Sequence, residues 1–274
     1  MPKNSKLETR KSKIALPRPS LHISIIIPTL NEGGVIRETL AGIPPAPDLE
    51  IILVDGGSTD NTLEAASHFP YLRVLRSPRG RGRQMNVGAL ASRGEILAFL
   101  HADTHLTPAH LTTLRSLASD PGFMAGAFEL ALMPPLPALR LIAWGANLRT
   151  RLLGLPYGDQ VLSVRRRLFF NLGGFTLRRP EDLDLVIRLQ RHTRLRVLTP
   201  PVASSGRRWL EQGYFATTLK NWLFLTYHLA QRTLTKKWSG GGEWSGGGGQ
   251  GSQTHLQSSP TPPPPTPYGS KKVG

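Results

Sequence analysis

The sequence predicts an α/β protein, a Rossmann-like three-layer α/β/α sandwich around a mostly parallel central sheet. Between residues 22 and 105, short aliphatic runs alternate with helical patterns of about ten residues, as in parallel strands joined by crossover helices. The apolar run at residues 97–100 leads into a polar tip that ends at Asp103. Such a run is typical of a buried parallel strand, and open α/β sheets bind ligands beyond the carboxyl ends of their strands.

Composition divides the 274 residues into three parts. Residues 1–20 are basic with few apolar side chains, and residues 238–274 are rich in Gly, Ser and Pro. Neither segment can bury enough apolar surface to offset its chain entropy, so we predict that both are disordered. Residues 21–237 are predicted to form one domain.

The absence of cysteine excludes disulfides and thiolate metal sites and fits a reducing compartment. No apolar run reaches the roughly 18 residues that a membrane span needs. We therefore expect a cytoplasmic protein, at the cytoplasmic face of the cell membrane if it contacts lipid.

The net charge of +16 is distributed unevenly along the chain. Residues 21–120 carry 8 basic and 10 acidic side chains, whereas residues 121–237 carry 18 basic and 6 acidic ones. A uniformly basic nucleic-acid binder would not leave its first folded half slightly acidic. The pattern favours a neutral nucleotide-binding half and a basic half that faces phosphate, anionic lipid or both.

In the first half, each strand is predicted to end at a polar turn that leads into a helix. Pro28 closes the first strand, and Pro44 and Pro45 stop the helix that follows it. The predicted strands are residues 22–28, 50–55, 72–75 and 97–103, and the predicted helices are residues 35–43, the segment from about 58 to 68, and 85–91.

In the second half, helices are predicted to dominate. The predicted elements are helices at 108–119, 134–152, 165–172, 180–191 and from just after Arg207-Arg-Trp209 to about 237, one strand at 123–132 and a loop at 154–159. Pro180 stands at the first position of its helix, where proline is favoured.

Polar side chains follow three of the predicted strands where each strand ends: Asn31 and Glu32, then Asp55, then Asp103. Side chains of these types can hydrogen-bond a base and a ribose, and Asp103 can hold a divalent cation. Taken singly, Asp55 and Asp103 could instead stabilise turns, and Glu32 could be a solvated helix start. Three such ends on adjacent strands favour a ligand site.

An ordered set of motifs resembles the inverting family 2 glycosyltransferases, which have the GT-A fold. The motifs are Ile27-Pro-Thr-Leu-Asn-Glu32, Val54-Asp-Gly-Gly-Ser-Thr-Asp60, Arg83-Gln-Met-Asn-Val-Gly88, His101-Ala-Asp103, Tyr157-Gly-Asp-Gln160, Gly173-Gly-Phe175, Glu181-Asp182 and Arg207-Arg-Trp209. The resemblance covers roughly residues 22–230. It implies a nucleotide-binding half at 21–105 and an acceptor half at 106–237.

The resemblance further implies a nucleotide-diphosphate sugar donor, UDP-linked or GDP-linked, and Mg²⁺ or Mn²⁺ as cofactor. Asp55 and Glu32 would contact the base and ribose, Asp103 would bind the metal, and Asp182 would be the general base. Matching positions would complete the site: Pro28, Asn31, Arg83, Asn86, Arg207, Arg208 and Trp209 for the donor, and Asp159, Gln160 and Glu181 for the acceptor.

His101 departs from the family pattern, because it replaces the first Asp of the Asp-x-Asp motif. Imidazole suits Zn²⁺ or Mn²⁺ better than Mg²⁺, so His101 is either a further metal ligand or a buried, hydrogen-bonded histidine. Trp209 likewise has two interpretations, a group that closes the donor site or a core residue. Arg79, Arg81 and Arg83 form a glycine-spaced loop that either embraces the diphosphate or is solvated.

The apolar segment Trp222–Tyr227 is followed by Arg232, Lys236 and Lys237. This pattern is typical of an interfacial helix that contacts anionic lipid, and equally of a helix packed on the domain. Family members often glycosylate lipid-linked acceptors, so the resemblance implies a small-molecule or lipid acceptor and a peripheral contact with the membrane.

Within the family, the sequence most resembles a bacterial subgroup linked with arsenosugar biosynthesis, whose members are also named carotenoid-acid glycosyltransferases. Two other functions compete with sugar transfer. A nucleotidyltransferase would need a basic triphosphate signature near the first strand, and residues 28–32 offer none. A non-enzymatic nucleic-acid-binding module is disfavoured by the acidic strand ends, so no specific nucleic acid is expected.

Overall fold

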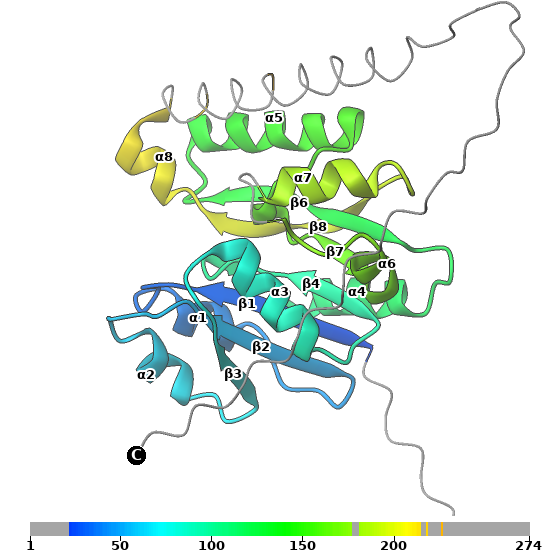
Figure 1. Ribbon diagram of the computed structural model, residues 1–274. Coiled ribbons are helices and arrows are strands. Elements are labelled where there is room, and N and C mark those ends of the chain that lie inside the picture. Colours follow the sequence, from blue (N-terminus) through cyan, green and yellow to red (C-terminus); the bar gives the residue numbers. More distant parts are fainter. Residues whose placement is uncertain (1–21, 177–180, 215–217, 219–225, 227–274) are drawn as a thin grey trace, which may run out of the picture. The chain divides into compact units, whose positions relative to one another are not determined.

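The computed structural model describes residues 22–176, 181–214, 218 and 226 (Figure 1). The two predicted disordered ends lie outside these residues, as do Pro180 and most of the predicted helix after residue 212. Within the described residues, no helix is both long enough and apolar enough to cross a bilayer.

The described strands form one eight-stranded sheet in the order β3-β2-β1-β4-β7-β6-β8-β5. Four neighbouring pairs are parallel, β1–β2, β1–β4, β2–β3 and β6–β8, and three are antiparallel. The predicted mostly parallel sheet is therefore confirmed. The strands are β1 (Ile23–Thr29), β2 (Leu49–Asp55), β3 (Leu72–Arg76), β4 (Ile96–Phe99), β5 (Thr104–His105), β6 (Ala125–Met133), β7 (Ser163–Arg165) and β8 (Arg196–Ser205).

Helices cover both faces of the first half of the sheet, which confirms the three-layer prediction (Figure 1). On one face, α1, α2 and α4 pack against alternate strand residues such as Ile25, Leu53 and Ala98. On the other face, Gly88 brings α3 close to Ile26, where an added Cβ would lie 2.4 Å from the Ile26 side chain. The described helices are α1 (Ile36–Ala41), α2 (Thr62–Ser67), α3 (Arg81–Ala91), α4 (Pro108–Ala118), α5 (Pro137–Leu153), α6 (Arg166–Asn171), α7 (Glu181–Leu189), α8 (Arg207–Gln212) and the 3₁₀ helix at Gly158–Gln160.

The strand predicted at residues 97–103 is shorter in the structure. β4 ends at Phe99, and residues 100–103 form a turn that leads into β5. The backbone of Asp103 is anchored there, because Ser205 N donates to its carbonyl oxygen at 3.1 Å. Asp103 is thus held by strand pairing between β5 and β8 rather than by β4 itself.

Three strands of the second half, β5, β7 and β8, were not predicted. β8 contains Pro200 and Pro201, which normally argue against a strand. The pairing of β6 with β8 shifts register between Phe128 and Leu130, so that the prolines fall in an irregular stretch. β7 and β5 have only three and two residues, too few to show an alternating pattern.

Candidate active site

The carboxyl ends of β1 and β2 are joined by a side chain of α3 and by side chains of the turns that follow the two strands. The buried Gln84 amide donates to the carbonyl oxygens of Thr29 and Val54, at 2.7 and 2.9 Å. Asn31, which has a positive φ of 56°, accepts from Thr59 N at 2.8 Å, and its own N–H donates to Ser58 Oγ at 2.9 Å. The two turns therefore form one rigid floor.

The Asp55 carboxylate is engaged by its own turn. It accepts from the backbone N–H groups of Gly57 and Ser58, at 3.0 and 3.1 Å, and from Ser58 Oγ at 2.5 Å. This is the turn-stabilising role that the sequence left open. Asp55 also lines a cavity of about 370 Å³ at this edge of the sheet, together with Gly57, Ser58, Leu63, Arg76, Ser77 and Pro78.

Beside this floor, three carboxylates influence one another across separate elements. Burial raises the pKa of Glu32, and the charge of Asp103 raises it further. Burial also raises the pKa of Asp159, where Asp103 opposes the lowering effect of Arg149. Glu32 Oε2 and Asp159 Oδ1 are buried oxygens without a hydrogen-bond partner. Arg207 near Glu32, and Arg149 and Arg208 near Asp159, offset this negative charge only in part, because burial and Asp103 still raise both pKa values.

This negative charge, which the arginines offset only in part, suits the binding of a metal cation. Among the residues that the structure describes, however, no group of three His, Asp or Glu side chains is placed to hold a metal ion. A metal at this edge would therefore take part of its ligands from phosphate oxygens, as Mg²⁺ commonly does in nucleotide sites.

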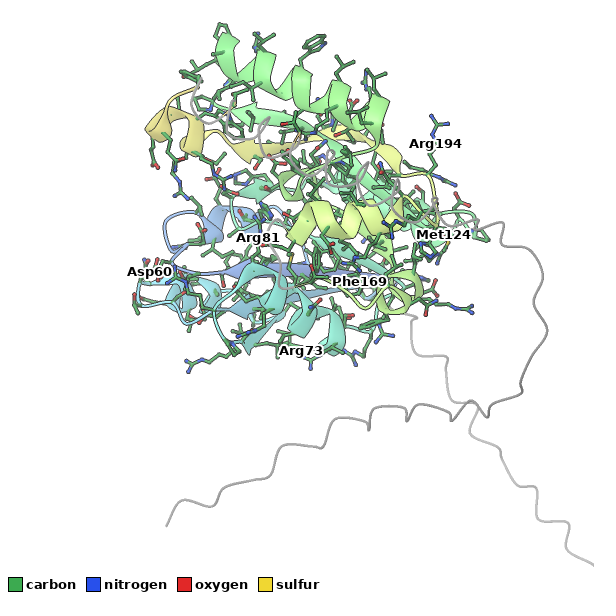
Figure 2. All side chains as sticks on the ribbon, turned by 45° about the horizontal axis from the view of Figure 1, so that its top comes forward. Asp60, Arg73, Arg81, Met124, Phe169 and Arg194 are labelled. Carbon is green, nitrogen blue, oxygen red and sulfur yellow. The ribbon has the colours of Figure 1, made fainter. Side chains whose placement is uncertain are left out.

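The predicted acid pair at the start of α7 is held by Arg81 from the start of α3. Arg81 Nε donates to Glu181 Oε1 at 2.9 Å, and Arg81 Nη2 donates to Asp182 Oδ2 at 2.6 Å. Both acids are only 7% exposed. Figure 2 shows Arg81 beside α7, although the two elements are about a hundred residues apart in the chain.

Burial raises the pKa of Asp182 to about 6, against the lowering effect of the Arg81 charge. Glu181 and Asp159 add to the rise. A carboxylate with this pKa is mostly ionised near neutral pH and still basic enough to accept a proton, which is what a general base requires.

His101 lies in the same group but is turned toward Arg81. Its Nε2 is 3.4 Å from Arg81 Nη1, and burial followed by the charges of Arg81 and Arg208 holds its pKa well below the ordinary value. The ring is therefore neutral and next to a guanidinium, where a metal ion would be repelled. This contact is the one expected of a buried, hydrogen-bonded histidine.

Gly158 separates His101 from Asp182. A Cβ at Gly158 would lie 2.5 Å from Asp182 Oδ2 and 2.6 Å from His101 Nε2. The Tyr157-Gly158 backbone can pass between these side chains only because residue 158 has none. The glycine of the Tyr-Gly-Asp-Gln motif thus shapes the space beside the candidate base.

Several residues expected to bind substrate instead make internal hydrogen bonds. The Asn86 amide pairs with the backbone of Phe175, at 2.8 Å and 2.9 Å. The fully buried Gln160 accepts from Thr150 Oγ1 at 2.9 Å and donates to the Phe128 carbonyl at 3.0 Å. Both amides position loops around the site.

The two arginines of α8 border the site, whereas Trp209 of the same helix lies in the hydrophobic core and Arg83 of α3 is exposed. Arg207 Nη2 lies 3.6 Å from Glu32 Oε2, and the charge of Arg208 acts on His101 and Asp159, so α8 borders the site. Trp209 packs in a hydrophobic cluster with Leu130, Leu132, Leu139 and Ala143, the core position that the sequence left open. Arg83 is exposed on α3.

The sequence left Arg81 either in a loop that embraces the diphosphate or solvated, and its pairing with the two acids of α7 was not expected. The sequence signal that could have indicated this contact is the alternation of arginine and glycine at residues 79–83. In the structure a Cβ at Gly82 would lie 3.3 Å from the Glu181 Cβ, so the glycine lets α7 approach α3. Glycine beside an arginine at a helix start is thus a usable sign of a close tertiary contact.

Replacing Arg81 by Met is expected to lower the free energy of unfolding at pH 8 by about 1–3 kcal/mol, because two buried carboxylates lose their partner. The Arg81 side chain is 36% exposed, which keeps the loss below that of a fully buried pair. At pH 5 the loss should shrink, since Asp182 is then largely protonated. Urea denaturation at both pH values measures this.

The matched control is Arg79→Met, in the same loop and exposed. Its stability should equal that of the unchanged protein at both pH values. Equal stability of the Arg81 and Arg79 variants would contradict the assigned role of Arg81.

Comparison with known proteins agrees with this geometry. A family model described as "Glycosyl transferase family 2" matches residues 24–184. A "PGL/p-HBAD biosynthesis glycosyltransferase" of Mycobacterium bovis is 34% identical over 165 residues, which are 57% of this chain and 63% of that protein. The chain thus spans less than two thirds of the length of this curated relative.

Two solved structures have a similar fold. The mannosyltransferase PcManGT from Pyrobaculum calidifontis, in complex with GDP-Man and Mn²⁺, has a TM-score of 0.58 and 25% identity, over 82% of this chain and 68% of that one. S. aureus TarS 1-349 has a TM-score of 0.56 and 19% identity, over 67% and 60%. These likenesses confirm the predicted GT-A fold.

Proposed function

The chain belongs to glycosyl transferase family 2, and from this premise we propose that it transfers a sugar from a nucleotide-diphosphate donor to an acceptor hydroxyl or carboxylate, with inversion at the anomeric carbon. The observation that carries the proposal is the meeting of acidic side chains from separate elements. The charge of Asp103 acts on Glu32 and Asp159, and the charge of Asp159 acts on Asp182.

The donor nucleotide is proposed to occupy the edge formed by the turns after β1 and β2. The cavity lined by Asp55, Arg76 and Ser77 is open to a base there, and Glu32 is close enough to Arg207 for both to face the ribose and diphosphate. TarS has been solved with UDP-GlcNAc, and PcManGT with GDP-Man, which supports a UDP-sugar or a GDP-sugar.

A divalent metal, Mg²⁺ or Mn²⁺, is proposed to be held by Asp103 together with the donor phosphates. The raised pKa values of Glu32 and Asp159, both acted on by the charge of Asp103, support a cation at this place, as does the Mn²⁺ in the PcManGT complex. When bound, the metal would offset the charge that builds on the leaving diphosphate. His101 is left out of the ligand set, because it faces Arg81.

Asp182 is proposed to take the proton from the acceptor hydroxyl. The acceptor oxygen then forms a bond to the anomeric carbon while the bond from that carbon to the diphosphate oxygen breaks, and the electron pair leaves with the diphosphate. Attack from the side opposite the leaving group gives inversion. Arg81 keeps the Asp182 carboxylate oriented, and a carboxylate acceptor would not need the proton transfer.

In this proposal, residues 21–105 would bind the nucleotide, and residues 106–237 would bind the acceptor. We also propose a small-molecule or lipid acceptor. The relative named for PGL/p-HBAD biosynthesis supports acceptors of this kind, while membership of the arsenosugar and carotenoid-acid subgroup rests on the His-Ala-Asp, Tyr-Gly-Asp-Gln and Arg-Arg-Trp motifs alone.

Thermal shift with a panel of UDP- and GDP-sugars, with and without Mn²⁺, tests the proposal. A donor at 100 times its Kd should stabilise the native state by about 2.7 kcal/mol, which raises the melting temperature by roughly 5–10 °C for a domain of this size. The shift should depend on Mn²⁺. If no nucleotide sugar raises the melting temperature under either condition, the proposed donor class is wrong.

A further inference from the structure

The helix α5 is apolar on two opposite faces. Its inner face carries Leu139, Ala143 and Thr150, all buried, and packs on β6 and on Trp209 of α8. This packing accounts for one apolar face, as in any amphipathic helix at a domain surface.

The outer face of α5 is equally apolar, and no part of the chain that the structure describes covers it. Leu141, Trp144, Leu148 and Leu152 are 66%, 62%, 38% and 72% exposed, and their spacing of three and four residues places them on one side of the helix. Figure 2 shows side chains projecting from the side of α5 that faces away from the sheet. We call these four residues the α5 outer face.

Other exposed apolar side chains lie in or next to the same two helices: Met133, Leu136 and Leu153 at α5, and Leu210 and Tyr214 in and after α8. A helix that is apolar on all sides is normally buried. An exposed apolar surface of this extent marks a binding face.

The charges around the α5 outer face indicate what would cover it. The helix contains Arg140, Arg149 and Arg151 and no acidic residue. Arg140 and Arg151 fall beside the apolar stripe, separated from Trp144 by four and seven positions, which is one helical face. Arg151 pairs with Glu129 of β6, and its side chain is still 60% exposed. Leucines and a tryptophan bordered by arginines are the composition of helices that lie in a lipid headgroup region.

The wider charge distribution agrees. Residues 121–237, which include α5, carry 18 basic and 6 acidic side chains. Anionic lipid attracts such a surface, whereas a second copy of this chain would bring a like charge toward it. The sequence after Tyr214 continues the same chemistry, with Trp222 to Tyr227 followed by Arg232, Lys236 and Lys237.

We propose that the α5 outer face is a membrane-docking surface for anionic lipid, with Leu141, Trp144, Leu148 and Leu152 at the acyl boundary and Arg140 and Arg151 at the headgroups. The docking is a property of the surface and does not depend on the proposed sugar transfer. Its test therefore measures binding and not activity.

The chain has no cysteine, so a fluorophore attached to a single introduced cysteine reports only on the surroundings of that position. In the full-length chain, Leu141→Cys is labelled with a polarity-sensitive fluorophore. Leu90→Cys is the matched control, because Leu90 is 70% exposed on α3. Each protein is mixed with vesicles of phosphatidylcholine alone or of phosphatidylcholine with phosphatidylglycerol, and emission and iodide quenching are recorded.

The expected result is a blue shift and loss of quenching at position 141 with the anionic vesicles, and no change at position 90. Shifts at both positions would assign binding to the basic ends of the chain, and a shift at neither position would show that the protein does not dock. Either outcome would overturn the proposal.

Protection at 141 in dilute protein without vesicles would show that the chain covers this face itself. Protection that grows with protein concentration would show a second copy. Both outcomes overturn the proposal too.

A second set of variants separates docking from folding. Trp144→Ser combined with Leu152→Ser should lower the affinity for anionic vesicles at least about tenfold, because two large apolar groups no longer leave water. Leu90→Ser should leave the affinity unchanged. Circular dichroism should be the same for all, since these side chains are exposed. Unchanged vesicle affinity in the double variant would contradict the docking surface.

Discussion

Replacing Asp182 by Asn is expected to lower kcat by about 10²- to 10⁴-fold, because the amide cannot accept the proton of an acceptor hydroxyl. Donor affinity should change little, since Asp182 lies with Arg81 and Gly158 rather than among the turns after β1 and β2. Steady-state kinetics with the donor identified by thermal shift, together with its Kd, separates the two effects.

The pH dependence of the unchanged protein follows from the same side chain. A base with a pKa of about 6 is protonated below that value, so kcat/KM should fall tenfold per pH unit below pH 6 and level off above it. Because the folded-state pKa lies above the ordinary 3.8, the native state binds more protons than the unfolded state between these values. Stability should therefore fall as the pH rises through this window.

Asp184→Asn is the control for loss of a carboxylate on the same helix, because Asp184 pairs with Arg188 at 2.8 Å, outside the acid pair. It should keep the acid limb of the pH profile. If Asp182→Asn weakens only donor binding and leaves kcat intact, Asp182 is not the base.

Replacing Asp103 by Asn is expected to remove the Mn²⁺ dependence of donor binding and to lower kcat/KM by about 10²-fold or more, because a single carboxylate would anchor the metal. The melting temperature without ligand should stay the same or rise, since the charge of Asp103 opposes those of Glu32 and Asp159. Calorimetric titration of the donor with and without Mn²⁺ measures the first effect.

The control is Asp48→Asn. Asp48 pairs with Arg115 at 2.7 Å next to the first residue of β2, at the opposite edge of the sheet from the site. Its Mn²⁺ dependence should be that of the unchanged protein. A Mn²⁺-dependent donor affinity that survives in Asp103→Asn would remove Asp103 from the metal site.

The first half of the fold could be predicted because its strands are long enough to show a pattern. β1 and β2 have seven residues each, nearly all buried, and each ends at a polar turn. The second half could be predicted only in part. Its helices and β6 show a pattern, but β7 is too short for one, and β8 holds two prolines that are tolerated only at its irregular pairing with β6.

The same limit applies to the site. The motifs placed Asp103, Asp159 and Asp182 in one region, but a motif does not distinguish a side chain that meets substrate from one that holds a loop. Asn86 and Gln160 prove to be bound to backbone groups. The pairing of Arg81 with Glu181 and Asp182 could not be predicted, because these partners lie about a hundred positions away and the contact depends on how closely two helices approach.

Helix α3 contacts three separate parts of the candidate site. Its first turn grips the proton acceptor through Arg81, Gln84 bridges the two strand ends, and Asn86 clamps the loop before α7. The proposed donor and acceptor sites therefore both depend on the position of α3. Substitutions along α3 should show strong thermodynamic coupling with substitutions at either site, because a movement of this helix shifts the donor site and the acceptor site at once.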